Sequence, residues 1–156
     1  MIKFCSLYSG SSGNCYYVNI DGKKILLDMG KSLKKITDAL EKIDEKIEEI
    51  DAILITHEHS DHIQGLKMLC KKHDKRIYMT DKTKTEVSNL VDNIIEENII
   101  TFKAGDKFEI GDVKVKSVKI SHDAIDPVMY SFKDIDGNKV SVFTDVGEIT
   151  DSILET

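Results

Sequence analysis

The feature that most constrains this chain is a cluster of histidines placed directly after a continuous apolar run. Residues 51–56 read Asp-Ala-Ile-Leu-Ile-Thr, as expected for an inner strand that is covered on both faces of a sheet. Three of the five histidines in the chain then follow in the spacing His57-x-His59-x-Asp61-His62. The alternative interpretation is an exposed polar loop. Because histidine is scarce in this chain, the cluster instead predicts a functional site.

The residue types in this cluster favour metal binding. Side chains alternate along extended backbone, so His57 and His59 share one face and both imidazoles can reach one ion. Asp61 and His62 lie at the turn into the next expected helix, where they can face a second ion beside the first. Imidazole and carboxylate ligands together suit Zn, Mn or Fe, and no cysteine lies within the cluster to build a structural cysteine-rich zinc site.

Two residues later in the chain fit the same pattern. His122 follows the alternating stretch 113–121, and Asp145 follows an expected strand over 139–144. Taken alone, His122 is typical of a loop histidine and Asp145 of a turn. Because strand ends place convergent side chains on a rigid sheet, we predict that both are metal ligands.

The remaining sequence alternates between strand and helix patterns, with no internal repeat and no linker. We therefore expect one mixed α+β / α/β domain over residues 1–156. Asp21-Gly22 is a hairpin signal, and Ser32 is a suitable N-cap for a helix. The expected strands are 2–8, 15–20, 23–28, 51–56, 76–80, 99–104, 113–121, 129–135 and 139–144. The expected helices begin at Ser32, cover 63–73 and 82–92, and start again near Thr150.

Composition excludes several classes of protein. The 156 residues are 40% hydrophobic, enough for one core and too rich in Ile, Leu and Val for a disordered chain. No apolar run approaches the roughly 18 residues of a membrane span, and we see no signal peptide, so we expect a cytoplasmic protein without membrane contact. The net charge of −6 argues mildly against binding nucleic acid by bulk charge, but it permits a local phosphate site.

Two further segments allow more than one interpretation. Residues 67–84 carry a local excess of five positive charges, which indicates either a track for nucleic acid or a solvated helix face. The Ser/Gly segment 9–13 could offer backbone N–H groups to a phosphate, or it could be a tight turn between strands.

Taken in order, these motifs resemble the metallo-β-lactamase fold hydrolases. The resemblance covers essentially the whole chain, through Asp28-Met29-Gly30, residues 56–62, His122 and Asp145-Val146-Gly147. Within that superfamily the sequence is most similar to the YycJ/WalJ-type, exonuclease-like branch. The motifs that point to this branch are Ser9-Gly10-Ser11-Ser12-Gly13-Asn14-Cys15-Tyr16, His122-Asp123-Ala124 with Pro127, and Thr144-Asp145-Val146-Gly147.

The resemblance implies a four-layer αββα sandwich with two divalent metal ions (Zn, Mn or Fe). It places Asp28 as a carboxylate that orients the ligand loop, and Asp61 as the catalytic residue that holds a metal-activated hydroxide. The implied ligands of the first ion are His57, His59 and His122, and those of the second are Asp61, His62 and a bridging Asp145. From the Ser/Gly segment described above, we predict Ser11, Ser12, Gly13 and Asn14 as substrate-binding residues.

The activity that this resemblance implies is phosphodiester hydrolysis, with DNA as the substrate of an exonuclease. The alternatives are a hydrolase of a small thioester, lactone or phosphodiester, and an inactive, truncated fragment. Such domains usually exceed roughly 200 residues, so we expect the chain to be about the N-terminal two-thirds of one. No histidine follows His122. We therefore expect an incomplete second metal site, and either weak activity or a homo-oligomer that covers the gap.

Overall fold

The first β-sheet combines a hairpin with parallel strands. The computed structural model describes residues 1–94 and 96–155 and places six strands in the order β1-β2-β3-β4-β5-β6. Asp21 and Gly22 form the expected turn, with φ of 49° and 82°, the left-handed values that a tight hairpin requires. From β3 onward the strands pair in parallel. The strands are β1 (Ile2–Tyr8), β2 (Cys15–Ile20), β3 (Lys23–Leu27), β4 (Ala52–Leu54), β5 (Arg76–Thr80) and β6 (Ile99–Phe102).

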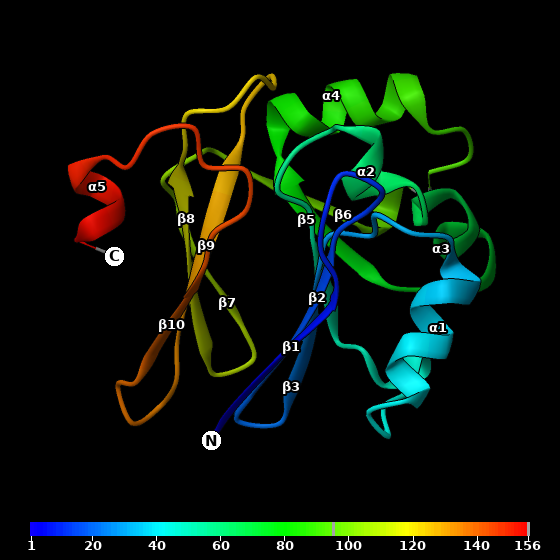
Figure 1. Ribbon diagram of the computed structural model, residues 1–156, viewed down its shortest axis with the longest axis horizontal. Helices are drawn as coiled ribbons and strands as arrows, with labels where there is room; N and C mark the ends of the chain where they lie inside the picture. Colours follow the sequence, from blue (N-terminus) through cyan, green and yellow to red (C-terminus); the bar gives the residue numbers. More distant parts are fainter. Residues whose placement is uncertain (95, 156) are drawn as a thin grey trace.

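Helices cover one face of this sheet (Figure 1). Ser32 caps the first helix as expected, because its side chain accepts a hydrogen bond from the Lys35 N–H. In the part of the chain that the structure describes, no helix has the length and apolar character needed to cross a membrane. The helices are α1 (Leu33–Glu41), α2 (Ser60–Ile63), α3 (Leu66–Lys72) and α4 (Asp81–Leu90), with short 3₁₀ turns at Ile47–Glu49 and Glu96–Asn98.

The helix expected over 63–73 is observed as α3 over 66–72, and the short helix α2 precedes it with a break between the two. A continuous helix would bond the Gly65 N–H to the Asp61 carbonyl. Here the Asp61 carbonyl accepts from the Asn14 N–H at 2.8 Å, and the Gly65 N–H donates to the Met29 carbonyl at 2.7 Å. Tertiary hydrogen bonds therefore replace the helical one, and they dock the chain after the histidine cluster onto the first sheet.

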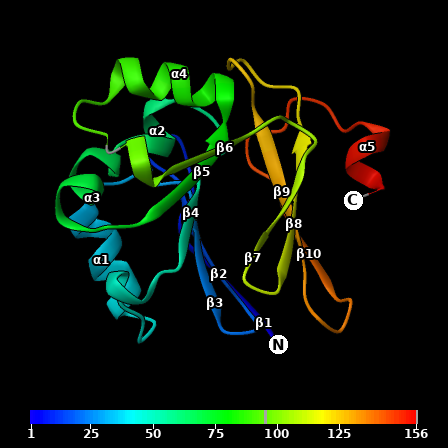
Figure 2. The same ribbon diagram turned by 180° about the vertical axis from the view of Figure 1, so that it is seen from behind.

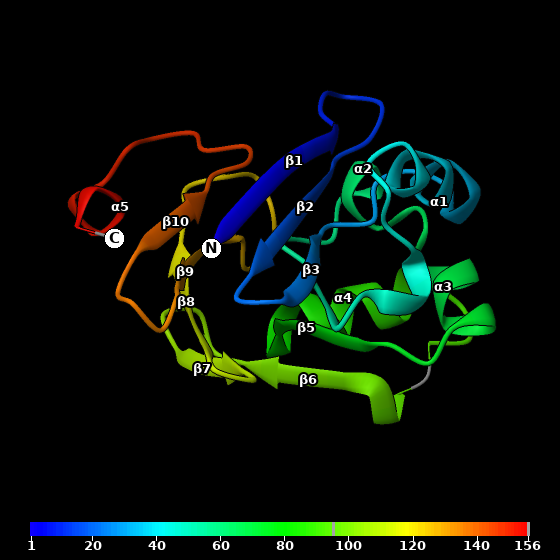
Figure 3. The ribbon, with the colours of Figure 1, turned by 90° about the horizontal axis from the view of Figure 1, so that it is seen from below.

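The second sheet is antiparallel and lies against the free face of the first. Its strand order is β10-β9-β8-β7, and the short helix α5 (Asp151–Leu154) lies beside its outer face (Figures 2 and 3). The expected strands over 129–135 and 139–144 are each shorter at the carboxyl end. The strands of this sheet are β7 (Lys107–Ile110), β8 (Val113–Lys119), β9 (Val128–Lys133) and β10 (Lys139–Val142).

Two main hydrophobic clusters hold these layers together. One fills the space between the helices and the first sheet, with Ile53 and Leu66 among its members. The other fills the space between the two sheets, with Leu54 and Tyr130 among its members. Ile53 and Leu54 are neighbours in sequence and point to opposite cores, which explains why their strand is apolar on both faces. The expected αββα class is confirmed, with α5 in the fourth layer.

The buried Tyr130 hydroxyl provides a test of the packing between sheets. It donates a 2.6 Å hydrogen bond to the Ile55 carbonyl, from β9 to the end of the opposite sheet. Tyr130→Phe should lower the free energy of unfolding by about 1–3 kcal/mol, because it leaves that carbonyl unpaired and buried. Urea denaturation measures the change. Tyr8→Phe is the matched control, since its hydroxyl bonds to the Lys35 carbonyl at an exposed position. Equal losses in both variants would contradict this account.

Candidate metal centre

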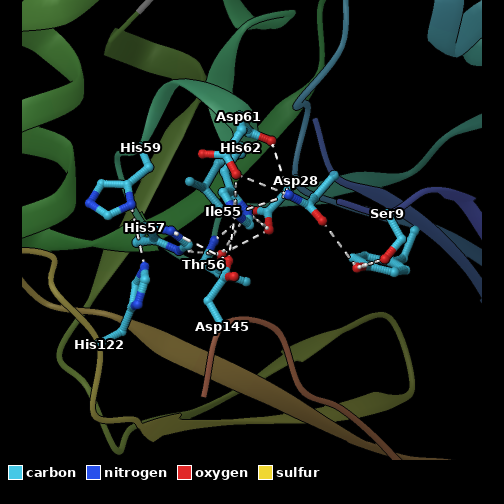
Figure 4. A network of polar contacts seen from close by, with 12 residues as sticks. Ser9, Asp28, Ile55, Thr56, His57, His59, Asp61, His62, His122 and Asp145 are labelled. Atoms are coloured by element: carbon cyan, nitrogen blue, oxygen red, sulfur yellow. Dashed lines mark hydrogen bonds and ion pairs between the residues drawn. The ribbon is translucent and has the colours of Figure 1, made fainter. Parts of the chain in front are cut away.

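Asp28 organises the loop that carries the histidine cluster (Figure 4). It follows β3, is fully buried and has a φ of 63°, a left-handed conformation that Asp tolerates better than most residues. Its carboxylate accepts hydrogen bonds from the Thr56 N–H at 2.7 Å and the Thr56 hydroxyl at 2.8 Å. The Nδ1 atom of His62 lies 2.7 Å from the same carboxylate. One buried carboxylate therefore binds both ends of the loop.

This network leaves His57 with a free nitrogen that faces the site. Since the Thr56 hydroxyl donates to Asp28, it accepts from the Nδ1–H of His57, 2.9 Å away. The other nitrogen of His57, Nε2, is buried without a hydrogen-bond partner among the described residues. Burial, followed by the neighbouring histidines, lowers the pKa of His57 to about 2. The imidazole is therefore neutral near pH 7, with a lone pair available to a ligand.

His62 is also oriented through its Nδ1 atom, which contacts Asp28, but further carboxylates lie near its other nitrogen. Its Nε2 atom lies 2.7 Å from Asp145 Oδ2 and 3.4 Å from Asp61 Oδ2. Burial by itself would lower the pKa of His62, but Asp28, followed by Asp61 and Asp145, raises it above the usual histidine value. A carboxylate behind an imidazole in this manner fixes the tautomer and makes the ring a stronger metal ligand.

The ligand atoms converge in two groups that share His57. Within each group the donor atoms lie within 4.8 Å of one another. His59 Nδ1 and His122 Nε2 lie 3.3 Å apart, and Asp145 Oδ2 lies 3.8 Å from His57 Nε2. Because bonds from zinc to these ligands are about 2.0–2.2 Å, small side-chain rotations bring each group onto one ion. The groups are His57, His59 and His122, and His57, His62 and Asp145.

Asp61, predicted as a ligand of the second ion, lies beside that group rather than within it. Its Oδ2 atom approaches His62 but accepts a 3.2 Å hydrogen bond from the Asn14 side-chain amide. The Asn14 side chain also donates to the Gly10 carbonyl, so it braces the 9–14 turn against the ligand loop. Asp145 lies between His57 and His62, the position expected of a bridging carboxylate.

The four predicted substrate-binding residues divide into two kinds. Ser11 and Ser12 line open hollows beside Asp61. Gly13 and Asn14 shape the turn instead. Gly13 has a φ of 148°, and a Cβ added there would lie 2.0 Å from the Gly30 carbonyl oxygen. The segment is therefore a tight turn, one of the two interpretations that the sequence allowed, and Ser11 and Ser12 remain exposed.

Three lysines of the basic stretch over 67–84 have partners within the chain. Lys67 pairs with Asp92 at 3.1 Å, and Lys84 pairs with Glu96 at 2.8 Å. Lys75 donates to backbone carbonyls near the start of β4, at the end of the sheet opposite the histidines. These contacts favour the interpretation as a solvated surface over a nucleic-acid track.

Thr56 is the residue of this network that the sequence interpretation did not identify. Its backbone and side chain connect Asp28 to His57, so it sets which nitrogen of that histidine faces the site. The available signal was its position, between the buried strand and the first histidine. Glu58 was also missed, although it lies between two predicted ligands. Its Oε1 atom accepts from the Ile125 N–H at 2.9 Å, which ties the ligand loop to the loop that carries His122.

Comparison with known proteins defines the class to which this fold and this site belong. Residues 23–156 match the beta-lactamase superfamily domain, and the chain belongs to that family. Over 150 residues it is 42% identical to the exodeoxyribonuclease YycJ of Bacillus anthracis, and over 151 residues it is 41% identical to the exodeoxyribonuclease WalJ of Streptococcus pneumoniae. These matches cover 96% of this chain, and the chain spans 56% of the length of either relative.

Solved structures show the same fold. Zn(2+)-bound PqqB from Methylobacterium extorquens superimposes with a TM-score of 0.81 at 16% sequence identity, covering 98% of this chain and 68% of that one. A metallo-beta-lactamase from Cronobacter sakazakii gives a TM-score of 0.70 at 15% identity, covering 85% of this chain and 58% of that one. The resemblance to the metallo-β-lactamase superfamily and its YycJ/WalJ-type branch is confirmed.

The role of Asp28 can be tested without removing a ligand. Asp28→Asn keeps the shape of the side chain but weakens its hold on His62, so the affinity for Zn²⁺ should fall about 10–100-fold. Competition titration against a chromophoric chelator measures the dissociation constant.

Asp51→Asn is the matched control for this substitution. It makes the same change of charge at an exposed carboxylate that accepts from the Lys24 N–H at the far end of the sheet. We expect its affinity for Zn²⁺ to equal that of the wild type. An Asp28→Asn protein that binds Zn²⁺ as tightly as the control would show that Asp28 has no part in orienting the ligands.

Proposed function

We propose that residues 1–156 form a domain that carries the metal centre of a metal-dependent hydrolase, an exonuclease that cleaves phosphodiester bonds of DNA. The observation that carries the proposal is the pair of ligand groups that share the buried, unpartnered Nε2 of His57. An orphaned nitrogen in a buried position is costly unless it has a partner, and a metal ion provides one. In this proposal His57 joins His59 and His122 on one divalent ion. Asp61, whose Oδ2 atom lies 3.4 Å from His62 Nε2, joins His62 and Asp145 on a second.

The donor set fits this assignment. Imidazole with carboxylate is the ligand chemistry of Zn, Mn and Fe sites, and the buried Asp28 holds the loop as such sites require. A divalent ion bound here would lower the pKa of a coordinated water and so supply a nucleophile at neutral pH. We assign the role of proton acceptor to Asp61, and the partial exposure of its carboxylate beside His62 supports this assignment. The Asn14 amide holds that carboxylate in position.

The choice of DNA as substrate rests on the relatives. The two described above are named exodeoxyribonucleases, and each is more than 40% identical to this chain. Ser11 and Ser12 add local support, because both lie next to Asp61 at the edge of the site, where hydroxyl and backbone N–H groups can contact a phosphate.

The test is an end-dependent cleavage assay on the complete gene product that contains this chain. With Mn²⁺ or Zn²⁺, it should release nucleotides from a linear, labelled single strand of DNA and leave a circular strand intact. Asp61→Asn should lower the rate by about 10²–10⁴-fold, the usual contribution of a positioned acid or base. Hydrolysis of a thioester or lactone without cleavage of DNA would refute the proposal.

A second variant tests the ligand assignment directly. His59→Ala should abolish metal uptake at the first group, because it removes one of three ligands, and the metal content of the purified protein measures this. His73→Ala is the matched control, since that histidine follows α3 away from the site. Equal metal contents in the two variants would contradict the assignment of His59.

A further inference from the structure

The ammonium group of Lys31 lies beside the 9–14 turn without an acidic partner. Its Nζ atom donates a 2.9 Å hydrogen bond to the Ser12 hydroxyl and lies 5.5 Å from the centre of the Tyr8 ring. No carboxylate among the described residues forms an ion pair with it, whereas Lys34, three positions later, pairs with Asp38 at 2.8 Å. Lys31 is therefore a cation that can take an external anion without breaking an ion pair.

The chain holds this side chain in place. Its stem lies against the turn, because a Cβ added to Gly13 would be 2.8 Å from Lys31 Cδ. Its backbone is enclosed as well, since a Cβ added to Gly65 would be 2.5 Å from the Lys31 carbonyl oxygen. The Tyr8 ring is fixed in turn, because its hydroxyl donates to the Lys35 carbonyl. A free lysine loses rotamer entropy when a ligand orders it, and these contacts reduce that loss.

The turn beside Lys31 presents further hydrogen-bond donors. Ser11 and Ser12 are its central residues, and the Gly13 N–H closes it onto the Gly10 carbonyl at 3.2 Å. That bond leaves the N–H groups of both serines unused, and no described residue accepts from them. Ser12 Oγ accepts from Lys31, so its own O–H is free to donate. Ammonium, hydroxyl and N–H donors therefore lie together, a combination that suits phosphate oxygens.

The two serines connect these donors to the metal centre. Both line a hollow that Asp61 also lines, and Ser11 lines a second hollow together with Asp61 and Asp145. Figures 1 and 3 show the turn between β1 and β2 beside α2, the helix that begins within the histidine loop. An anion bound by these donors would therefore lie at the edge of the same site, not on a remote surface.

We infer that Lys31, Ser11 and Ser12 bind a phosphate of the substrate strand next to the phosphate that is cleaved at the metal centre. The inference rests on the proposed function, and it adds Lys31 to the residues that recognise the substrate. The ammonium group supplies the charge, and the hydroxyl and N–H groups supply directed hydrogen bonds to the phosphate oxygens. Since these contacts reach the backbone alone, they position the strand and select no base sequence.

Inorganic phosphate tests the anion site without metal, DNA or catalysis. The isotopically labelled chain is titrated with sodium phosphate in EDTA at constant ionic strength, and the amide NMR signals of Ser11 and Ser12 are followed. These signals should shift to saturation. Lys31→Met should weaken the affinity about threefold or more, because it removes a charged donor but keeps an apolar stem against Tyr8.

Lys35→Met is the matched control for this titration. It removes the charge of an exposed lysine on α1 and keeps the backbone carbonyl that accepts from Tyr8. We expect its affinity for phosphate to equal that of the wild type. Signals that do not move in the wild type, or equal affinities in the two variants, would overturn the inference.

The salt dependence of DNA binding tests whether the anion belongs to a strand. The dissociation constant of a labelled, single-stranded oligonucleotide is measured by fluorescence anisotropy for the complete gene product, in EDTA and at several salt concentrations. One phosphate contact contributes about 0.7 to the slope of log K against log salt for a single strand. Lys31→Met should therefore lower the slope by about 0.7, whereas Lys31→Arg, which keeps the charge, should retain the wild-type slope.

The two measurements separate this inference from the proposed function. An unchanged slope in Lys31→Met, or a wild type that does not bind the oligonucleotide, would overturn the assignment to a strand and leave free phosphate as the ligand. A gene product that cleaves DNA without a phosphate site at the turn would overturn the inference alone. Both binding effects without any cleavage would refute the proposed hydrolysis and support the strand contact.

Discussion

The buried carboxylate of Asp28 is the contact on which the rest of the site depends. It lies at the end of β3 and bonds to Thr56 and His62, which begin and end the histidine loop. A buried carboxylate is tolerated only when its oxygens are hydrogen-bonded, and these partners meet that demand. The same bonds orient His57 and His62 so that the Nε2 atom of each faces the site. That of His57 has no hydrogen-bond partner among the described residues, and that of His62 lies 2.7 Å from Asp145 Oδ2. The hydrogen bonds that hold this strand end in place therefore also orient the two histidines.

The second sheet completes the centre because its loops lie at the same edge. The Val128 N–H bonds to the Thr56 carbonyl, so the start of β9 is tied directly to the ligand loop. The Gly147 N–H bonds to the Ser121 carbonyl at 2.7 Å, which joins the loop that carries Asp145 to the loop that carries His122. Tyr130 connects the two sheets nearby. The ligands of the 57–62 loop are therefore held close to His122 and Asp145, which lie about 60 to 90 positions later in the chain.

Much of this was predictable from local patterns. The continuous apolar run before His57 indicated a strand between two cores, and Ile53 and Leu54 do pack into different cores. Asp21-Gly22 predicted the hairpin, because few residues tolerate positive φ. The helix predicted over 63–73 is confirmed over 66–72, but its start was wrong, since hydrogen bonds to Asn14 and Met29 break the chain between α2 and α3. Periodicity does not reveal such a break, because the competing partners lie more than 30 residues away.

The sequence by itself determined the kinds of ligand, their spacing after a buried strand and the superfamily, because these depend on residue identity and order alone. Only the tertiary structure decided that His57 belongs to both ligand groups, that Asp61 is held by Asn14 and that Glu58 connects the ligand loop to the loop that carries His122. Those properties depend on which atoms meet across the two sheets. That is set by the packing of distant segments around a buried carboxylate, which no local pattern encodes.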